Sequence, residues 1–242
     1  MIESLKKVFR ENSNQPFYFA WPTIVFIFMQ LVFVFAAIGI FLIYFVVAAL
    51  LGVNTGIDQL PTQIAVALVA VLLIFFSTGL NASLARAYYN AVKKEKTSVV
   101  EFFKTALVKS PVAFTVQLIR EFLYLLVVGP VVAVFYLYLK DIQYVDILFY
   151  VYVFFATFIV HMLFTPALIS NGIYGTGLFS SLKNGFTLLR RRHIFFFGLY
   201  MVFAFVWLAN IIPFFNIITL FFLYPLVYAS MGVLMDSTIR GG

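Results

Sequence analysis

The chain has 242 residues, of which 64% are apolar, 20% aromatic and only 10% charged, and its net charge is +7. Soluble domains carry about 25% charged and about 45–50% apolar residues, so this composition leaves too little polar surface for a water-soluble fold. The chain contains no cysteine, which excludes disulfides, thiol catalysis and cysteine-based metal sites. We therefore expect an all-α integral membrane protein.

Six apolar segments along the chain predict six transmembrane helices. A helix needs about 20 mostly apolar residues to cross the hydrocarbon core. The expected spans cover residues 17–51, 64–80 with a more polar continuation to 92, 122–139, 147–169, 194–209 and 214–235. Gly129-Pro130 predicts a kink in the third span, and Asn210 to Pro213 predict a tight turn between the last two.

Basic residues gather in alternate connecting segments, and this asymmetry predicts the orientation. Fourteen of the sixteen lie on one side: Lys6, Lys7, Arg10, Arg86, Lys93, Lys94, Lys96, Lys104, Lys109, Lys183, Arg190, Arg191, Arg192 and Arg240. The opposite loops hold only Lys140, together with Asp58, Asp141 and Asp146, while Arg120 is not assigned to a side. We expect a multi-pass protein of the cell (cytoplasmic) membrane with both termini cytoplasmic. The N-terminal residues lack the apolar core of a secretory signal peptide.

A short pattern recurs before the first, third and fifth spans. In each copy a serine is followed five residues later by a phenylalanine: Ser4 and Phe9, Ser98 and Phe103, Ser181 and Phe186. Each copy leads, after a boundary residue, into a span: Pro16, Pro111 and His193. Because such a repeat organises a whole chain, we predict three tandem helical hairpins within a single transmembrane domain, in units of about 1–96, 97–179 and 180–242.

Each of these leader segments is expected to form an amphipathic helix that lies in the membrane surface. Leu5, Val8 and Phe9 recur at helical spacing in the first, and Ser98 and Glu101 have the spacing of a capping box in the second. Basic side chains of the leaders are expected to contact lipid headgroups: Lys6, Lys7, Arg10, Lys104, Lys109, Arg190, Arg191 and Arg192. We favour simple anchoring over recognition of one headgroup or partner.

An amphipathic leader of the type S-L-K-x-x-F followed by a transmembrane hairpin, repeated along a six-span chain, resembles a broad group of prokaryotic membrane proteins. The group includes the membrane domain fused to some bacterial glycerophosphodiester phosphodiesterases, and related stand-alone archaeal and bacterial proteins. The resemblance implies a multipass fold. No enzymatic activity is carried over from this group, because a catalytic phosphodiesterase domain is absent from these 242 residues.

Polar residues at membrane depth are candidate functional residues, because ionisable groups are costly there. Gln117, Arg120, Glu121 and Tyr124 fall on one face of a helix, at i, i+3, i+4 and i+7. Arg120 and Glu121 are sequence neighbours and are not expected to pair directly. Since residues 122–139 already supply 18 apolar positions, both can lie at the cytoplasmic interface, with Arg120 reaching lipid phosphates. We favour this interface over a buried polar site.

The second span carries a ridge of small residues, Gly79, Ser83 and Ala87, which permits close approach of another helix. Asn81 beside the ridge is expected to form a hydrogen bond across helices, and it is also a candidate for the polar site.

The fourth span places Thr157, His161 and Thr165 on one stripe before a kink at Pro166. An intramembrane histidine either serves a ligand or proton or is simply hydrogen-bonded, and we favour the second role. The stretch NGIYGTG after this span predicts a flexible exit.

No catalytic motif emerges, because the two histidines lie on different segments and neither HExxH nor a phosphate-binding glycine loop occurs. We expect no metal, no cofactor and no nucleic-acid partner. The expected function is that of a non-enzymatic scaffold or subunit of a membrane complex, with the lipid bilayer and a protein partner or second copy as partners. The alternative is a transporter or permease subunit for a lipid or hydrophobic solute, with a cavity near Arg120, Glu121, Asn81 and His161.

Overall fold

The computed structural model describes residues 2–56, 59–140, 142, 144–209, 219, 221 and 224–239, with side chains omitted at 2–5 and 202–209. Within these residues the fold is all-helical and has no strand. The helices are α1 (Ile2–Asn14), α2 (Pro16–Leu50), α3 (Leu60–Val92), α4 (Val99–Val134), the π-helix η1 (Phe135–Leu139), α5 (Val145–Tyr174), α6 (Leu178–Ala209) and α8 (Tyr224–Ile239).

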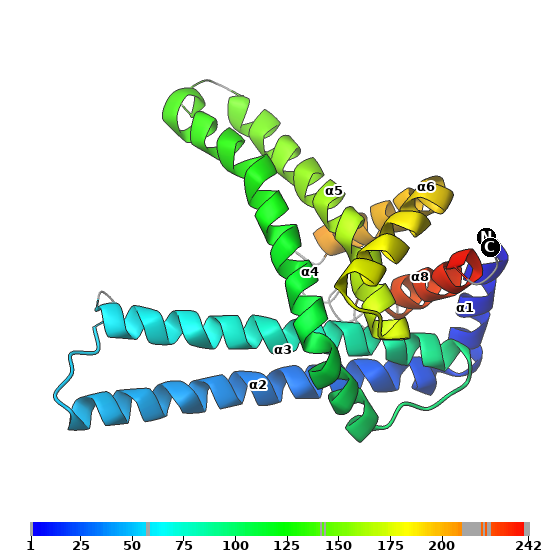
Figure 1. Ribbon diagram of the computed structural model, residues 1–242. Helices are drawn as coiled ribbons and strands as arrows, with labels where there is room; N and C mark the ends of the chain where they lie inside the picture. The colour runs from blue at the N-terminus through cyan, green and yellow to red at the C-terminus, as the bar shows by residue number, and fades with distance from the viewer. Residues whose placement is uncertain are drawn as a thin grey trace.

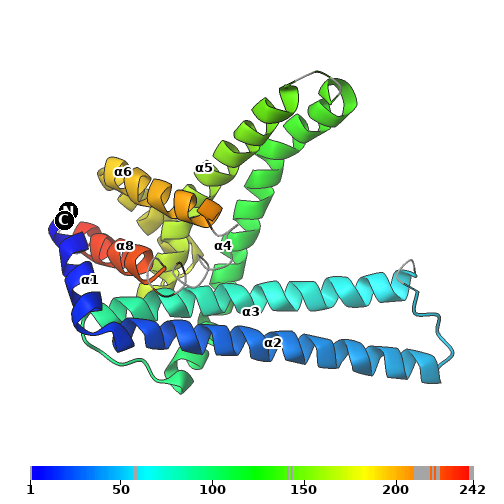
Figure 2. The ribbon, with the colours of Figure 1, turned by 180° about the vertical axis from the view of Figure 1, so that it is seen from behind.

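Two long helical arms diverge from a common base (Figures 1 and 2). One arm is formed by α2 and α3, and the other by α4, η1 and α5. The base contains α1, α6 and α8, and α1 packs against α8. Because α3 contacts α2, α4, α5 and α8, it is the central helix of the fold.

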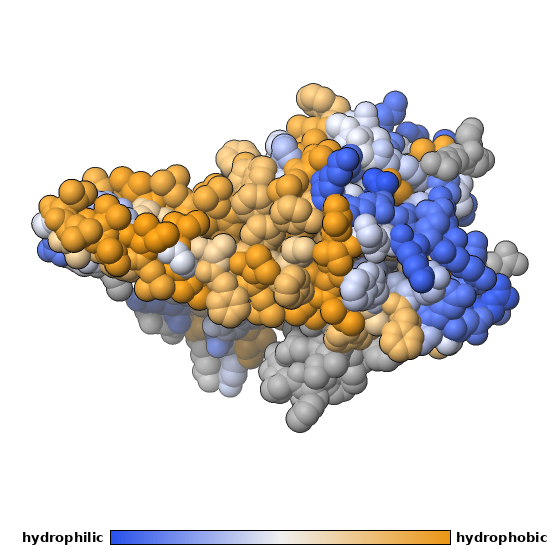
Figure 3. All heavy atoms as spheres, turned by 90° about the horizontal axis from the view of Figure 1, so that it is seen from below, coloured by the Kyte–Doolittle hydropathy of each residue, from blue (hydrophilic) through white to orange (hydrophobic). Residues whose placement is uncertain are grey.

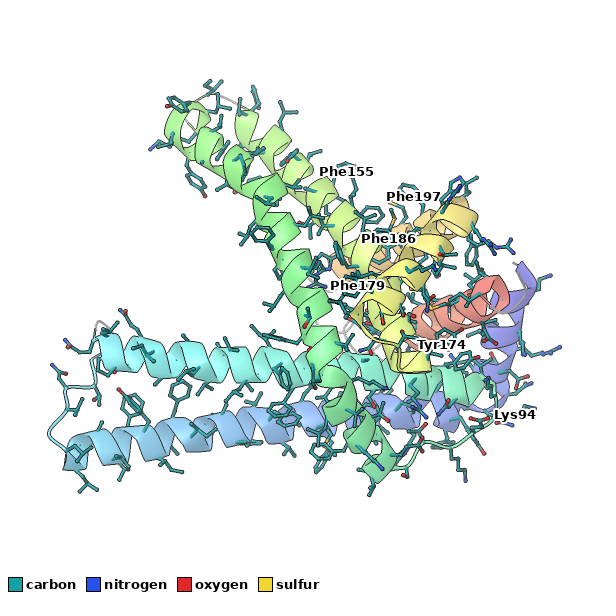
Figure 4. The ribbon with its side chains drawn as sticks, viewed as in Figure 1. Lys94, Phe155, Tyr174, Phe179, Phe186 and Phe197 are labelled. Atoms are coloured by element: carbon teal, nitrogen blue, oxygen red, sulfur yellow. The ribbon has the colours of Figure 1, made fainter. Side chains whose placement is uncertain are left out.

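Among the described residues, four helical segments are long and apolar enough to cross a membrane: Pro16–Leu50, Leu60–Val92, Val99–Leu139 and Val145–Tyr174. In the most apolar stretch of each, only 11–22% of the residues are buried within the chain. Apolar side chains therefore project outward along both arms (Figure 4). Exposed apolar surface of this extent is unfavourable in water, so the chain is a multi-pass membrane protein with lipid-facing arms.

The last two predicted spans differ from the first four. The fifth lies within α6, which is not among the four span-like segments and whose helical path is broken at Arg192, with φ −135° and ψ 29°. The sixth overlaps α8, whose described length is 16 residues. The predicted turn at 210–213 and most of residues 214–223 lie outside the described part of the chain.

The boundaries predicted between leaders and spans are present at two of three places. Gln15 leaves the helical conformation just before Pro16 and separates α1 from α2, and the break at Arg192 lies next to His193. Pro111, however, lies inside α4, so the second leader is continuous with its span. In α4 the departure from the α-helical pattern comes at η1, after the kink position predicted at Gly129-Pro130.

A serine cap fixes the start of α4. The Ser98 hydroxyl oxygen accepts a hydrogen bond from the Glu101 backbone N–H at 3.1 Å, which satisfies one of the donors left unpaired at a helix start. The capping role expected from the sequence spacing is confirmed for this bond.

Replacing Ser98 with alanine is expected to lower the free energy of unfolding by about 1 kcal/mol. The change should be measured as a shift of the unfolding midpoint in mild detergent. Thr115→Ala is the matched control, because the Thr115 hydroxyl only bonds back to the Pro111 carbonyl of its own helix. Equal shifts in the two variants would contradict a capping role.

Small residues allow the helices to cross closely. Gly79 of α3 lies directly against Ala106 and Ser110 of α4, and the Ser83 hydroxyl donates to the Phe102 carbonyl at 2.7 Å. The close approach predicted for this ridge is therefore present.

A second crossing joins α3 and α5, where Gly172 lies against the Ala82 carbonyl. Gly172 thus belongs to a packed helix, and the prediction of a flexible exit over NGIYGTG is wrong for its first four residues. Helix α5 continues to Tyr174 and ends at Gly175, whose φ of +65° suits glycine.

Polar contacts hold the base together, and hydrophilic side chains gather at this end while the arm is apolar (Figure 3). Lys94 pairs with Glu11 of α1 at 3.7 Å. The Arg191 guanidinium donates to the Thr238 carbonyl near the end of α8 at 3.1 Å, and the Tyr174 hydroxyl donates to Asp236 at 3.2 Å.

Candidate functional site

A cavity of about 560 Å³ lies where the two arms meet. Its described lining residues come from six helices: α2, α3, α4, α5, α6 and α8. Its polar lining consists of Gln30, Ser77, Thr78, Asn81, Gln117, Arg120, His161, Thr165, Tyr200, Tyr224 and Tyr228. Pockets of this size commonly hold small organic ligands, with a few polar groups that fix their orientation.

Four of the polar residues singled out in the sequence line this one cavity. Asn81 comes from α3, Gln117 and Arg120 from α4, and His161 from α5. The sequence placed Gln117 and Arg120 on a shared helix face, but their convergence with Asn81 and His161 depends on how three helices cross.

Arg120 is paired with its neighbour Glu121, contrary to the expectation from helix geometry. Its Nε and Nη2 atoms donate to Glu121 Oε1 at 3.1 and 2.5 Å, and Gln117 Nε2 donates to the same oxygen at 2.6 Å. The expectation failed because the long arginine side chain can turn its head group back toward the next residue. The Arg120 side chain is 13% exposed and that of Glu121 is 45% exposed. The arginine therefore faces inward, while its charge partner lies nearer the surface.

Glu121 and Tyr124 are not among the described residues that line the cavity. Glu121 is joined to it through Arg120 and Gln117. The Tyr124 hydroxyl instead accepts a hydrogen bond from the Thr157 hydroxyl of α5 at 3.3 Å.

The cross-helix hydrogen bond predicted for Asn81 is not found among the described residues. Its side-chain amide donates to the Ser77 carbonyl of the same helix at 3.0 Å, because its head group lies toward the cavity and not toward a neighbouring helix. The cross-helix bond at this level comes from Gln30 of α2, which donates to the Ser77 hydroxyl at 3.0 Å.

His161 lines the cavity, and its backbone carbonyl also accepts a hydrogen bond. The Thr165 hydroxyl donates to the His161 carbonyl at 2.7 Å and lies 3.2 Å from the Tyr200 hydroxyl. The predicted stripe Thr157–His161–Thr165 thus faces neighbouring helices and the cavity.

In the part of the chain that the structure describes, hydroxyl pairs between threonine and tyrosine join helices at four places, a feature that sequence reasoning missed. The pairs are Thr23–Tyr88, Tyr44–Thr62, Tyr124–Thr157 and Thr165–Tyr200, at 2.7–3.3 Å. Cross-helix hydrogen bonds of this kind stabilise helix association in lipid. Tyrosine counts as apolar in composition, so only its recurrence opposite threonine within the spans could have signalled these bonds.

The basic residues expected to contact headgroups lie on α1, α4 and α6. Exposed positions are Lys6, Lys7, Arg10, Lys104, Arg190, Arg191 and Arg192. Lys109 differs, because it is partly buried and its ammonium group lies against Gly175 at the end of α5.

No group of three or more histidine, aspartate and glutamate side chains is placed to hold a metal ion in the part of the chain that the structure describes. Comparison of the chain with protein families, with curated proteins and with solved structures finds no match.

Proposed function

We propose that this membrane protein binds an amphiphilic ligand, a lipid or a hydrophobic solute, in the cavity between its arms, and that it acts without enzymatic activity as a transporter or permease subunit. One observation carries the proposal. The cavity gathers Asn81, Gln117, Arg120 and His161 from three helices that are otherwise strongly apolar. Such polar groups within membrane spans mark ligand or substrate pathways.

The cavity has apolar as well as polar lining residues, and part of its apolar lining lies toward the tip of the arm formed by α2 and α3. Val34, Leu73 and Ile74 lie nearer the tips of α2 and α3 than the polar Gln30 and Ser77 do. A ligand with a polar head toward Arg120 and an apolar body toward these three side chains would satisfy both regions. A lining that combines polar and apolar side chains favours a ligand-binding pocket over an empty gap left by helix packing.

The wider topology belongs to the same proposal: six spans in three hairpins, both termini on the cytoplasmic side of the cell membrane, and a surface-lying leader before each hairpin. The surface position of the leaders is supported by the exposure of one phenylalanine in each of them. Val8 and Phe102 are buried, whereas the phenylalanines that follow them, Phe9 and Phe103, are 65% and 36% exposed. Phe186 of the third leader is 48% exposed (Figure 4). An exposed phenylalanine at each leader suits insertion into the membrane surface.

Kinship with the prokaryotic proteins related to phosphodiesterase membrane domains stays a prediction, as does a scaffold role. A scaffold would act through a protein partner or second copy and would leave the cavity without a specific ligand. The two functions are therefore separable by one experiment.

The test is the ligand content of protein purified in mild detergent, measured by extraction and mass spectrometry. Arg120→Gln is expected to lower the recovered ligand at least tenfold, because charge-assisted hydrogen bonds contribute about 1.5–3 kcal/mol. Lys140→Gln is the control, since Lys140 is an exposed basic residue that neither lines the cavity nor is among the residues expected to contact headgroups. Unchanged ligand content in Arg120→Gln, with a protein partner recovered in fixed proportion, would replace the proposal with the scaffold.

A further inference from the structure

A second cavity, of about 500 Å³, lies at the base of the fold, away from the junction of the arms. It is bounded by the first turns of α2, by α3 at Ala87 and by the loop from α3 to α4. It shares no described lining residue with the first cavity, so it stands independently of the proposed function.

The two sides of this cavity differ in chemistry. Helix α2 contributes the aromatic rings of Phe17, Tyr18 and Trp21, while the loop contributes Glu95 and Lys96. Aromatic rings thus face a pair of opposite charges across one space.

Two contacts hold the loop over the aromatic rings. The Trp21 indole N–H donates to the Thr97 carbonyl at 3.3 Å, and the Lys96 ammonium lies 5.7 Å from the centre of the Tyr18 ring. These contacts join residues 76 and 78 positions apart in sequence. The cavity is therefore formed by tertiary packing and does not depend on one exposed side chain.

The residues around the cavity are of the kinds found at the edge of a membrane. The apolar helix α2 begins at Pro16, and the loop carries the basic Lys93, Lys94 and Lys96. Tryptophan and tyrosine are enriched at this level of a bilayer, beside the lipid headgroups.

We propose that this cavity binds the headgroup of a zwitterionic phospholipid with a primary amine. The phosphate is held by the Lys96 ammonium and by the hydroxyl of Ser98, which also lines the cavity. The amine of the lipid is held by the Glu95 carboxylate and by the faces of the aromatic rings, which attract cations. The adjoining apolar surface of α2 accommodates the acyl chains.

The test uses the fluorescence of Trp21, one of two tryptophans in the chain. Trp207→Phe removes the other and is the parent for all variants. The purified full-length protein in detergent is titrated with short-chain phosphatidylethanolamine and, separately, with short-chain phosphatidylglycerol, which has the phosphate but no amine.

Phosphatidylethanolamine is expected to bind about tenfold more tightly than phosphatidylglycerol, since only its amine reaches Glu95. Glu95→Gln should abolish this preference without weakening phosphatidylglycerol, and Lys96→Gln should weaken both lipids about tenfold. Lys140→Gln, which changes an exposed lysine that neither lines the cavity nor is among the residues expected to contact headgroups, should match the parent.

Equal affinities for the two lipids in the parent, or unchanged affinities in both Glu95→Gln and Lys96→Gln, would overturn the proposal. An equal response of Trp21 to inorganic phosphate would replace it with a simple anion site. Arg120→Gln is expected to leave these titrations unchanged. A negative result for the headgroup site can therefore be distinguished from a negative result for the ligand site in the first cavity.

Discussion

Replacing Gly172 with alanine is expected to destabilise the protein by about 2–3 kcal/mol. A Cβ atom at this position would overlap the Ala82 carbonyl of α3. Because the clash is with backbone atoms, it can be relieved only by moving α3 and α5 apart. The loss should be measured as a lowered unfolding midpoint in mild detergent.

Gly39→Ala and Gly129→Ala are the matched controls. Both glycines lie inside helices, and a Cβ atom on either would meet nothing within 4 Å. Alanine favours the helical conformation by about 0.5–1 kcal/mol relative to glycine, so these variants should be neutral or slightly more stable. A Gly172→Ala protein as stable as the controls would show that α3 and α5 do not cross this closely.

Glu121→Leu is expected to lower stability by about 2 kcal/mol, less than the loss for a fully buried ion pair, because Glu121 is 45% exposed. The substitution removes the oxygen that accepts hydrogen bonds from Arg120 and Gln117, and it leaves the inward-facing arginine without its charge partner. The change should be followed by the unfolding midpoint of the purified protein.

The double variant Arg120→Leu/Glu121→Leu separates stability from function. Removing both charges should restore stability to within about 1 kcal/mol of the parent, because apolar side chains can replace such a pair. Ligand content should nevertheless stay low, since the charged group of the cavity is gone. If the double variant were as unstable as Glu121→Leu alone, the pairing would not be the reason for the loss.

Much of the helical framework could be predicted from the sequence. The first apolar run predicted a helix over 17–51, and α2 covers Pro16–Leu50, because an uninterrupted apolar segment in lipid must satisfy its backbone as a helix. The cap at Ser98 followed from local spacing in the same way. Pro111 was misjudged as a boundary, since α4 accommodates it without ending.

The candidate cavity could be predicted only in part. Helical periodicity placed Gln117 and Arg120 together, but the meeting with Asn81 and His161 depends on the contacts of α3 with α4 and α5. These contacts rest on glycines such as Gly172, whose sequence neighbourhood suggested a flexible segment. Tyr200 was missed because a tyrosine in an apolar run gives no local sign of a partner on another helix.

The divergence of the arms constrains how the protein stands in a bilayer. At 1.5 Å per residue the 35-residue α2 is about 52 Å long, against about 30 Å of hydrocarbon. Two arms that diverge cannot both lie along the membrane normal, so at least one of them must be tilted. Tilt, or local thickening of the bilayer, accommodates the length of the helices beyond the hydrocarbon thickness. The cavity is lined by residues of both arms. Bilayers of different thickness would change the tilt of each arm, and through it the width of the cavity.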